Sequence, residues 1–121
     1  KGFQIMISPG ILCTGNEAEL RQCVSILLDN AVKYCDEGGE IQVSLFREKR
    51  VVLEVVNTYT QAETLEYRKL FDRFYRADAA RTVGNSYGLG LSIARSIVRR
   101  HKGTITAAPL DKGRILFRVI L

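Results

Sequence analysis

Two side chains in the middle of a long apolar pattern are suited to hold a metal ion and its phosphates. Asn30 and Lys33 lie three residues apart and Tyr34 follows directly, so Asn30 and Lys33 project from neighbouring positions on one helix face. An amide oxygen can be one hard ligand of an octahedral Mg²⁺ that keeps several waters and its phosphates, and a lysine offsets phosphate charge. The alternative is an ordinary surface pair of Asp29 and Lys33 beside a solvated Asn30.

A glycine-rich segment that runs into a helical pattern is a second candidate for phosphate binding. Its residues are Gly84-Asn85-Ser86-Tyr87-Gly88-Leu89-Gly90-Leu91. At a helix start, free backbone N–H groups and the helix dipole favour an anion. The spacing fits neither a Walker loop nor a Rossmann fingerprint, and glycines needed for helix packing are an equal alternative. The arginines just before it, Arg73, Arg76 and Arg81, either close over a nucleotide or form a solvated basic loop.

The other reactive side chains and the net charge exclude several classes of function. His101 is the single histidine, on the apolar face at a helix end, where a structural role is expected, and no Ser/His/Asp set for hydrolysis exists. Cys13, Cys23 and Cys35 form no Cys-x-x-Cys pair, which fits a reducing cytosol. The net charge of +5 admits nucleic acid, but no strand interleaves aromatic and basic residues, so we expect no nucleic-acid binding.

The elements that position these residues follow from the hydrophobic periodicity. We expect strands at 2–8, 11–13, 41–45, 51–56, 104–107 and 115–121, with a charged turn at 47–50. Helices are expected from an Asn16 cap to near Cys35, over a short stretch at 70–75, and from 88–91 to Gly103. The last helix has an apolar face of Gly90, Ile93, Ala94, Ile97, Val98 and His101, and a mobile loop is expected from Arg76 to Tyr87.

The order of these elements predicts an α+β fold, a two-layer α/β sandwich in which a mixed sheet carries its helices on one face. The chain has 121 residues, of which 46% are hydrophobic, and this length suits one domain over 1–121. No stretch approaches the roughly 20 apolar residues that cross a bilayer.

Taken together and in this order, the segments resemble the ATP-binding catalytic domain of bacterial sensor histidine kinases, a branch of the Bergerat-fold or GHKL ATPases. Residues 27–34 (Leu-Leu-Asp-Asn-Ala-Val-Lys-Tyr) resemble that family's N box, and 70–76 (Leu-Phe-Asp-Arg-Phe-Tyr-Arg) its F box. Residues 88–94 (Gly-Leu-Gly-Leu-Ser-Ile-Ala) resemble its G2 box, and 101–105 the end of its last helix. The resemblance spans nearly the whole chain.

The resemblance implies a role for each matching residue. Asn30 would ligate Mg²⁺, Lys33 and Arg76 would meet phosphates, Tyr34 and Tyr75 would line the nucleotide, and Gly88, Leu89, Gly90 and Leu91 would bound the ATP lid.

Two departures from the family pattern stand out. Asn57, Tyr59 and Gln61 fall on the Asp and the two Gly of the G1 box, so Asn57 would accept from the adenine amino group through its amide oxygen. Ile26 stands where most relatives carry a second Asn, which leaves Asn30 as the one metal-ligating amide.

The function that the resemblance implies is that of a protein-histidine kinase with ATP and Mg²⁺ as cofactors. The γ-phosphoryl group would pass to a histidine on a separate dimerisation domain and then to a response regulator. The chain would be a monomeric cytoplasmic fragment of a larger sensor, anchored in the membrane through upstream segments. The alternative is a degenerate, non-catalytic module of the same fold that acts through protein contacts with weak or no nucleotide binding, which Tyr59, Gln61 and Ile26 favour.

Overall fold

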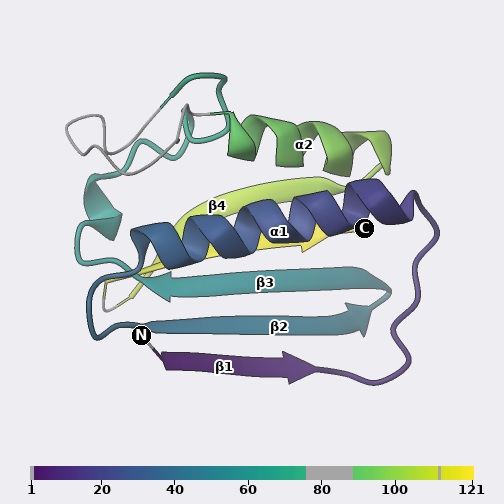
Figure 1. The fold of residues 1–121 in the computed structure, drawn as a ribbon, viewed down its shortest axis with the longest axis horizontal. Helices are drawn as coiled ribbons and strands as arrows, with labels where there is room; N and C mark the ends of the chain where they lie inside the picture. The colour runs from purple at the N-terminus through teal and green to yellow at the C-terminus, as the bar shows by residue number, and fades with distance from the viewer. Residues whose placement is uncertain (1, 76–88, 112) are drawn as a thin grey trace.

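The computed structural model describes residues 2–75, 89–111 and 113–121 and shows one mixed sheet with helices on a single face (Figure 1). The strands are β1 (Gly2–Ile7), β2 (Glu40–Glu48), β3 (Arg50–Thr58), β4 (Thr104–Leu110) and β5 (Arg114–Ile120), in the order β1-β2-β3-β5-β4. The helices are α1 (Glu17–Tyr34) and α2 (Gly90–Arg100), with a 3-10 turn η1 (Ala62–Thr64) after β3. The β1–β2 pair is parallel and the other pairs are antiparallel, which confirms the expected α+β sandwich.

The long helix α1 begins at the predicted cap. Asn16 has an extended backbone, and its side chain accepts from the Glu19 N–H at 3.0 Å, which satisfies one of the free amides of the first turn. Glu17 and Glu19 oppose the positive end of the helix dipole. The buried stripe of Cys23, Leu27 and Ala31 has helical spacing and faces the sheet.

The core lies between the helices and the central strands. α1 packs on β3, α2 packs on β4, and the two helices pack on each other. The largest fully buried side chains come from both helices and from β2, β3 and β5: Leu27, Ile41, Val55, Asn57, Ile97, Val98 and Val119. Asn57 is the one polar residue in that set, which makes its surroundings important for function.

Four expectations for the elements were wrong. Residues 11–13 form no strand, because this stretch carries the chain from β1 up to α1 and has no strand beside it. The charged turn expected at 47–50 is only one residue long. β2 ends at Glu48 and β3 begins at Arg50, and Lys49 between them reverses the chain with a φ of 60°. The stretch 70–75 is a series of turns, with Phe74 at φ 67°.

The fourth expectation, the face of α2, was wrong only in part. Ala94, Ile97 and Val98 are buried as expected, but Ser92 is buried as well and Ile93 is 38% exposed. The buried Ser92 hydroxyl donates to the Leu89 carbonyl at 2.8 Å, which removes the cost of burying it.

The helix layer does not reach the β1 edge of the sheet. Phe3, Ile5 and Ile7 on β1 are about 60% exposed, and they line an apolar groove together with Leu20 and Val24 of α1. Within the described residues, neither helix has the length and apolar character needed to cross a membrane.

Candidate functional site

One cavity gathers residues from four separate segments near the C-terminal end of α1. Its lining residues are Asn30 and Tyr34 of α1, Leu65, Leu70 and Tyr75 of the segment after β3, Leu91 of α2, and Ile115 and Phe117 of β5. Four of these eight, namely Asn30, Tyr34, Tyr75 and Leu91, are residues that the sequence singled out. Arg76, Gly88 and the loop expected over 76–87 lie outside the described residues.

Lys33 stands beside this cavity and does not line it. Its Nζ lies 5.8 Å from the centroid of the Tyr34 ring. Among the ion pairs of the described residues there is none between Asp29 and Lys33, so the surface-pair alternative has no support. The Lys33 ammonium group therefore lies over the Tyr34 ring, which forms one wall of the cavity, and a phosphate bound in the cavity would attract it.

Asn57 does not itself line the cavity, but it lies beside a lining residue and carries an unsatisfied polar atom. The residue is fully buried on β3, and its register partner on β5 is Ile115, which lines the cavity. Its Nδ2 donates to the Thr58 carbonyl at 3.3 Å, whereas Oδ1 is buried with no partner among the described residues. An orphaned buried acceptor costs about 1–3 kcal/mol, so Oδ1 is an acceptor that a ligand amino group would satisfy.

The two residues on the positions of the G1 glycines leave the described cavity free. Tyr59 is buried edge-on against Tyr34, with ring centroids 6.2 Å apart and planes at 78°. Gln61 is exposed and precedes η1. Neither residue is among those that line the cavity.

Tyr67 braces the segment that contains η1. Its hydroxyl donates to the Ala62 carbonyl at 2.7 Å. Burial raises the pKa of Tyr67 to about 12, with smaller contributions from Glu63 and Tyr59. The polar tip of this side chain is therefore satisfied by the protein itself, unlike Asn57 Oδ1.

The start of α2 presents backbone amides next to the cavity. Leu89 occupies the cap position without a side-chain cap, and the first N–H groups of a helix have no intrahelical acceptor. A Cβ on Gly90 would lie 3.3 Å from Cγ2 of Ile26 on α1, so this glycine also serves close helix packing. For Gly90 the packing alternative therefore has direct support, and Ile26 acts as its packing partner.

Asn30 also suits a Mg²⁺ ion that takes few ligands from the protein. The described part of the chain contains no group of three or more His, Cys, Asp or Glu side chains that could hold a metal by itself. A magnesium ion here would take the Asn30 amide oxygen as a protein ligand and phosphates and water for the rest, which is its usual preference.

The other four lining residues were not among the candidate site residues predicted from the sequence. Leu70 lies in the F-box stretch, and Ile115 and Phe117 alternate on β5 as inward-facing positions. The sequence placed both residues on the expected strand at 115–121, and only the folded structure shows that they line the same cavity as Asn30 and Tyr34. Leu65 carried no signal.

Residues 15–121 match the family model of histidine kinase-, DNA gyrase B- and HSP90-like ATPases. The chain belongs to this family. It is 45% identical over 102 residues to the sensor protein CiaH of Streptococcus pneumoniae, covering 83% of this chain and 23% of CiaH. It is 34% identical over 121 residues to the signal transduction histidine-protein kinase BaeS of Escherichia coli, covering 98% of this chain and 26% of BaeS.

A solved structure gives the same fold. The mycobacterial sensor histidine kinase MprB superposes with a TM-score of 0.86 at 25% identity, over 99% of this chain and 82% of that one. The chain thus spans about a quarter of the length of the curated relatives it matches. It is an ATP-binding domain of the histidine-kinase type, and these relatives lend no support to the non-catalytic alternative.

Proposed function

We propose that this chain binds ATP with Mg²⁺ in the cavity between α1 and α2 and acts as the catalytic domain of a sensor histidine kinase. The observation that carries the proposal is the orphaned Oδ1 of Asn57, a buried acceptor behind the cavity wall that matches the amino group of adenine. The family match indicates ATP as the ligand, and the side chains around the cavity indicate how it would be bound.

Each end of the nucleotide has a matching set of groups. Asn57 Oδ1 accepts from the base, and Tyr34, Tyr75 and Leu91 give its apolar walls. The Asn30 amide oxygen would hold the metal ion, which would supply positive charge to neutralise the phosphates. Lys33, Arg76 and the backbone amides of residues 88–91, of which Gly90 and Leu91 begin α2, meet the phosphates.

The chemistry that these residues support is positioning and charge stabilisation of a phosphoryl transfer. A neutral imidazole nitrogen of a histidine on a separate dimerisation domain attacks the γ-phosphorus, the bond to the bridging oxygen breaks, and ADP leaves. A response regulator then takes the phosphoryl group. His101 is not the acceptor, because both of its ring nitrogens are engaged within the protein at the far end of α2.

The location and the assembly of the parent protein belong to the same proposal. The homologues are sensor proteins, and we infer that this domain lies on the cytoplasmic side of a membrane-anchored kinase, where ATP is available. The isolated domain is monomeric in this proposal, and dimerisation rests with the acceptor domain.

A melting scan with and without Mg·ADP tests the proposal. A ligand that binds only the native state stabilises it by RT ln(1 + [L]/Kd), about 2.7 kcal/mol at roughly 100 times Kd. We expect a rise in Tm with Mg·ADP and a smaller one with ADP plus a chelator. No rise at millimolar Mg·ADP would favour the non-catalytic module, and transfer from ATP to a supplied acceptor domain would test the kinase activity itself.

A further inference from the structure

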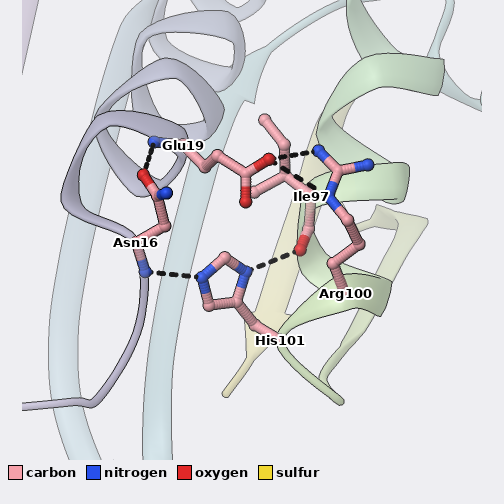
Figure 2. Close-up of polar contacts among 5 residues, drawn as sticks. All are labelled: Asn16, Glu19, Ile97, Arg100 and His101. Atoms are coloured by element: carbon pink, nitrogen blue, oxygen red, sulfur yellow. Dashed lines mark hydrogen bonds and ion pairs between the residues drawn. The ribbon is translucent and has the colours of Figure 1, made fainter.

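The start of α1 and the end of α2 are joined by a small polar cluster, which we call the His101 joint: Asn16, Glu19, Arg100 and His101 (Figure 2). The His101 Nε2 accepts from the Asn16 backbone N–H at 3.0 Å. Nε2 must therefore be unprotonated, so Nδ1 carries the proton and donates to the Ile97 carbonyl at 2.8 Å. One neutral ring thus connects the last turn of α2 to the cap of α1.

A second contact in the joint runs parallel to the first. Both Nε and Nη2 of Arg100 donate to Oε2 of Glu19, the Nε contact at 3.1 Å. The Glu19 backbone N–H in turn donates to the Asn16 side chain. At the start of α1, the cap residue Asn16 contacts His101, the cap residue at the end of α2, and Glu19 of the first turn contacts Arg100, the last residue of α2.

The backbone around the joint leaves the imidazole almost no freedom. A Cβ on Gly15 would lie 2.5 Å from Cδ2 and 2.7 Å from Nε2 of His101, closer than real Cβ contacts. On the opposite side, Nη2 of Arg50 donates to the Lys102 carbonyl at 2.8 Å and Nε to the Leu121 carbonyl at 3.1 Å. The C-terminal end of α2 is thus fixed both to α1 and to the sheet.

The joint lies at the opposite end of the helix pair from the cavity. α1 and α2 run side by side in opposite directions, so the end of α2 lies beside the start of α1 (Figure 1). α2 is a rod of 11 residues, about 16 Å at roughly 1.5 Å per residue. Its other end places Leu91 in the cavity wall with Asn30 and packs Gly90 against Ile26.

We propose that His101 is a positioning residue for the nucleotide site, acting through α2. This rests on the proposed function, because it concerns how the same cavity is held ready for nucleotide. The joint fixes the register of α2 along α1, and with it the distance between the first amides of α2 and Asn30. Without the joint, α2 keeps its apolar packing and the Arg50 contact to the Lys102 carbonyl, but it loses its polar ties to α1. The binding-competent register is then less populated, and the apparent Kd rises to the intrinsic Kd divided by the populated fraction.

Two variants separate the hydrogen bonds from the bulk of the ring. His101→Gln keeps a neutral acceptor and a donor, whereas His101→Leu keeps apolar bulk and removes both. Calorimetric titration with Mg·ADP, well below the Tm of every variant, should give a Kd roughly threefold to tenfold higher for His101→Leu, the fold-change of about one net hydrogen bond. His101→Gln should restore most of the parent affinity.

A matched control distinguishes positioning from general stability. Val43→Ala removes buried side-chain volume on β2, belongs neither to the polar contacts of the joint nor to the cavity lining, and should lower Tm without changing the Kd. Arg100→Gln, which breaks only the pair with Glu19, is a milder second variant should His101→Leu not fold.

The outcomes are distinct. An unchanged Kd in His101→Leu, or in Arg100→Gln where that variant takes its place, overturns the positioning role, and so does an equal loss of affinity in Val43→Ala. A parent protein that does not bind Mg·ADP overturns the proposed function, and this inference with it. A raised Kd in His101→Leu that His101→Gln restores, beside an unchanged Val43→Ala, is the result that the positioning role requires.

Discussion

The two ends of the α1–α2 pair use polar groups in opposite ways. At the His101 joint, the Asn16 N–H, the Glu19 carboxylate and both ring nitrogens of His101 each meet another protein atom. At the cavity end, Asn57 Oδ1 is buried without a partner. Polar groups that the protein satisfies hold its architecture together, whereas the polar atom that the fold buries and leaves unsatisfied is the one for which we propose a ligand contact.

The largest expected effect comes from the cavity end. Asn30→Ala should abolish the Mg²⁺ dependence of nucleotide binding, at least about tenfold in Kd, because it removes the side-chain oxygen proposed as the metal ligand. The fold should survive, since Asn30 is only half-buried and lies outside the stripe of Cys23, Leu27 and Ala31. Calorimetric titration of ADP with and without Mg²⁺ measures the effect.

The neighbouring Asp29 provides a matched control for that experiment. Asp29 is exposed on the same helix, so Asp29→Ala should bind Mg·ADP like the parent. If Asn30→Ala binds as tightly as Asp29→Ala, the metal assignment is wrong.

The next effect is on stability and comes from the joint end. Gly15→Val should lower the free energy of unfolding by about 1–3 kcal/mol, because its Cβ would overlap the His101 ring and push it off the Asn16 N–H. Denaturant unfolding measures the change. Gly2→Ala is the control, since the nearest atom to its Cβ is Glu40 Cγ at 3.8 Å, and an equal loss in both variants would show that the close approach at Gly15 does not matter.

The sequence predicted the local features of this comparison and missed the non-local ones. The Asn16 cap, the stripe of α1 and the β2–β3 hairpin depend on neighbours in sequence, so periodicity and cap chemistry were sufficient. The contact of Asn16 with His101 joins residues 85 positions apart, and no local pattern signals it. The strand expected at 11–13 and the face expected for α2 near Ser92 were wrong for the same reason. Whether 11–13 finds a neighbouring strand, and which side of α2 is buried, depend on how the layers pack, and a local pattern does not contain that information.

The same division between local and non-local features applies to the candidate site. The boxes placed Asn30, Tyr34, Tyr75 and Leu91 by resemblance, and the structure brings these four to one cavity. Whether Asn57 was paired or orphaned depended on what β5 and the helices place around it, which a single sequence does not contain.

A smaller effect is expected from changing the orphaned acceptor itself. Asn57→Asp should tighten ADP binding by about 1 kcal/mol, near fivefold in Kd, because an ionised acceptor makes a stronger hydrogen bond and desolvation offsets part of the gain. Asn57→Leu removes the acceptor and should weaken binding by at least as much. Titration of ADP into the parent and both variants decides the point, and three equal affinities would mean that Asn57 does not contact the base.

The smallest effect concerns Tyr67, a satisfied polar group in the segment that lines the cavity, and it contrasts directly with Asn57. The unfolded chain releases the Tyr67 proton near its ordinary pKa of 10, whereas the folded protein holds it to about 12. Between these values the unfolded state binds fewer protons, so the contribution of Tyr67 to stability is complete below pH 10 and is lost as the pH rises toward 12.

Tyr67→Phe should therefore lower stability at neutral pH by about 0.5 kcal/mol, through loss of the bond to the Ala62 carbonyl, and should make the alkaline decline shallower. Unfolding curves of parent and variant from pH 8 to pH 12 test this, since the other tyrosines are common to both. Nucleotide affinity at neutral pH should not change, because the hydroxyl is already satisfied by the protein. If Tyr67→Phe loses ADP affinity as strongly as Asn57→Leu, the proposed contrast is wrong: the hydrogen-bonded Tyr67 would then serve binding as well as stability.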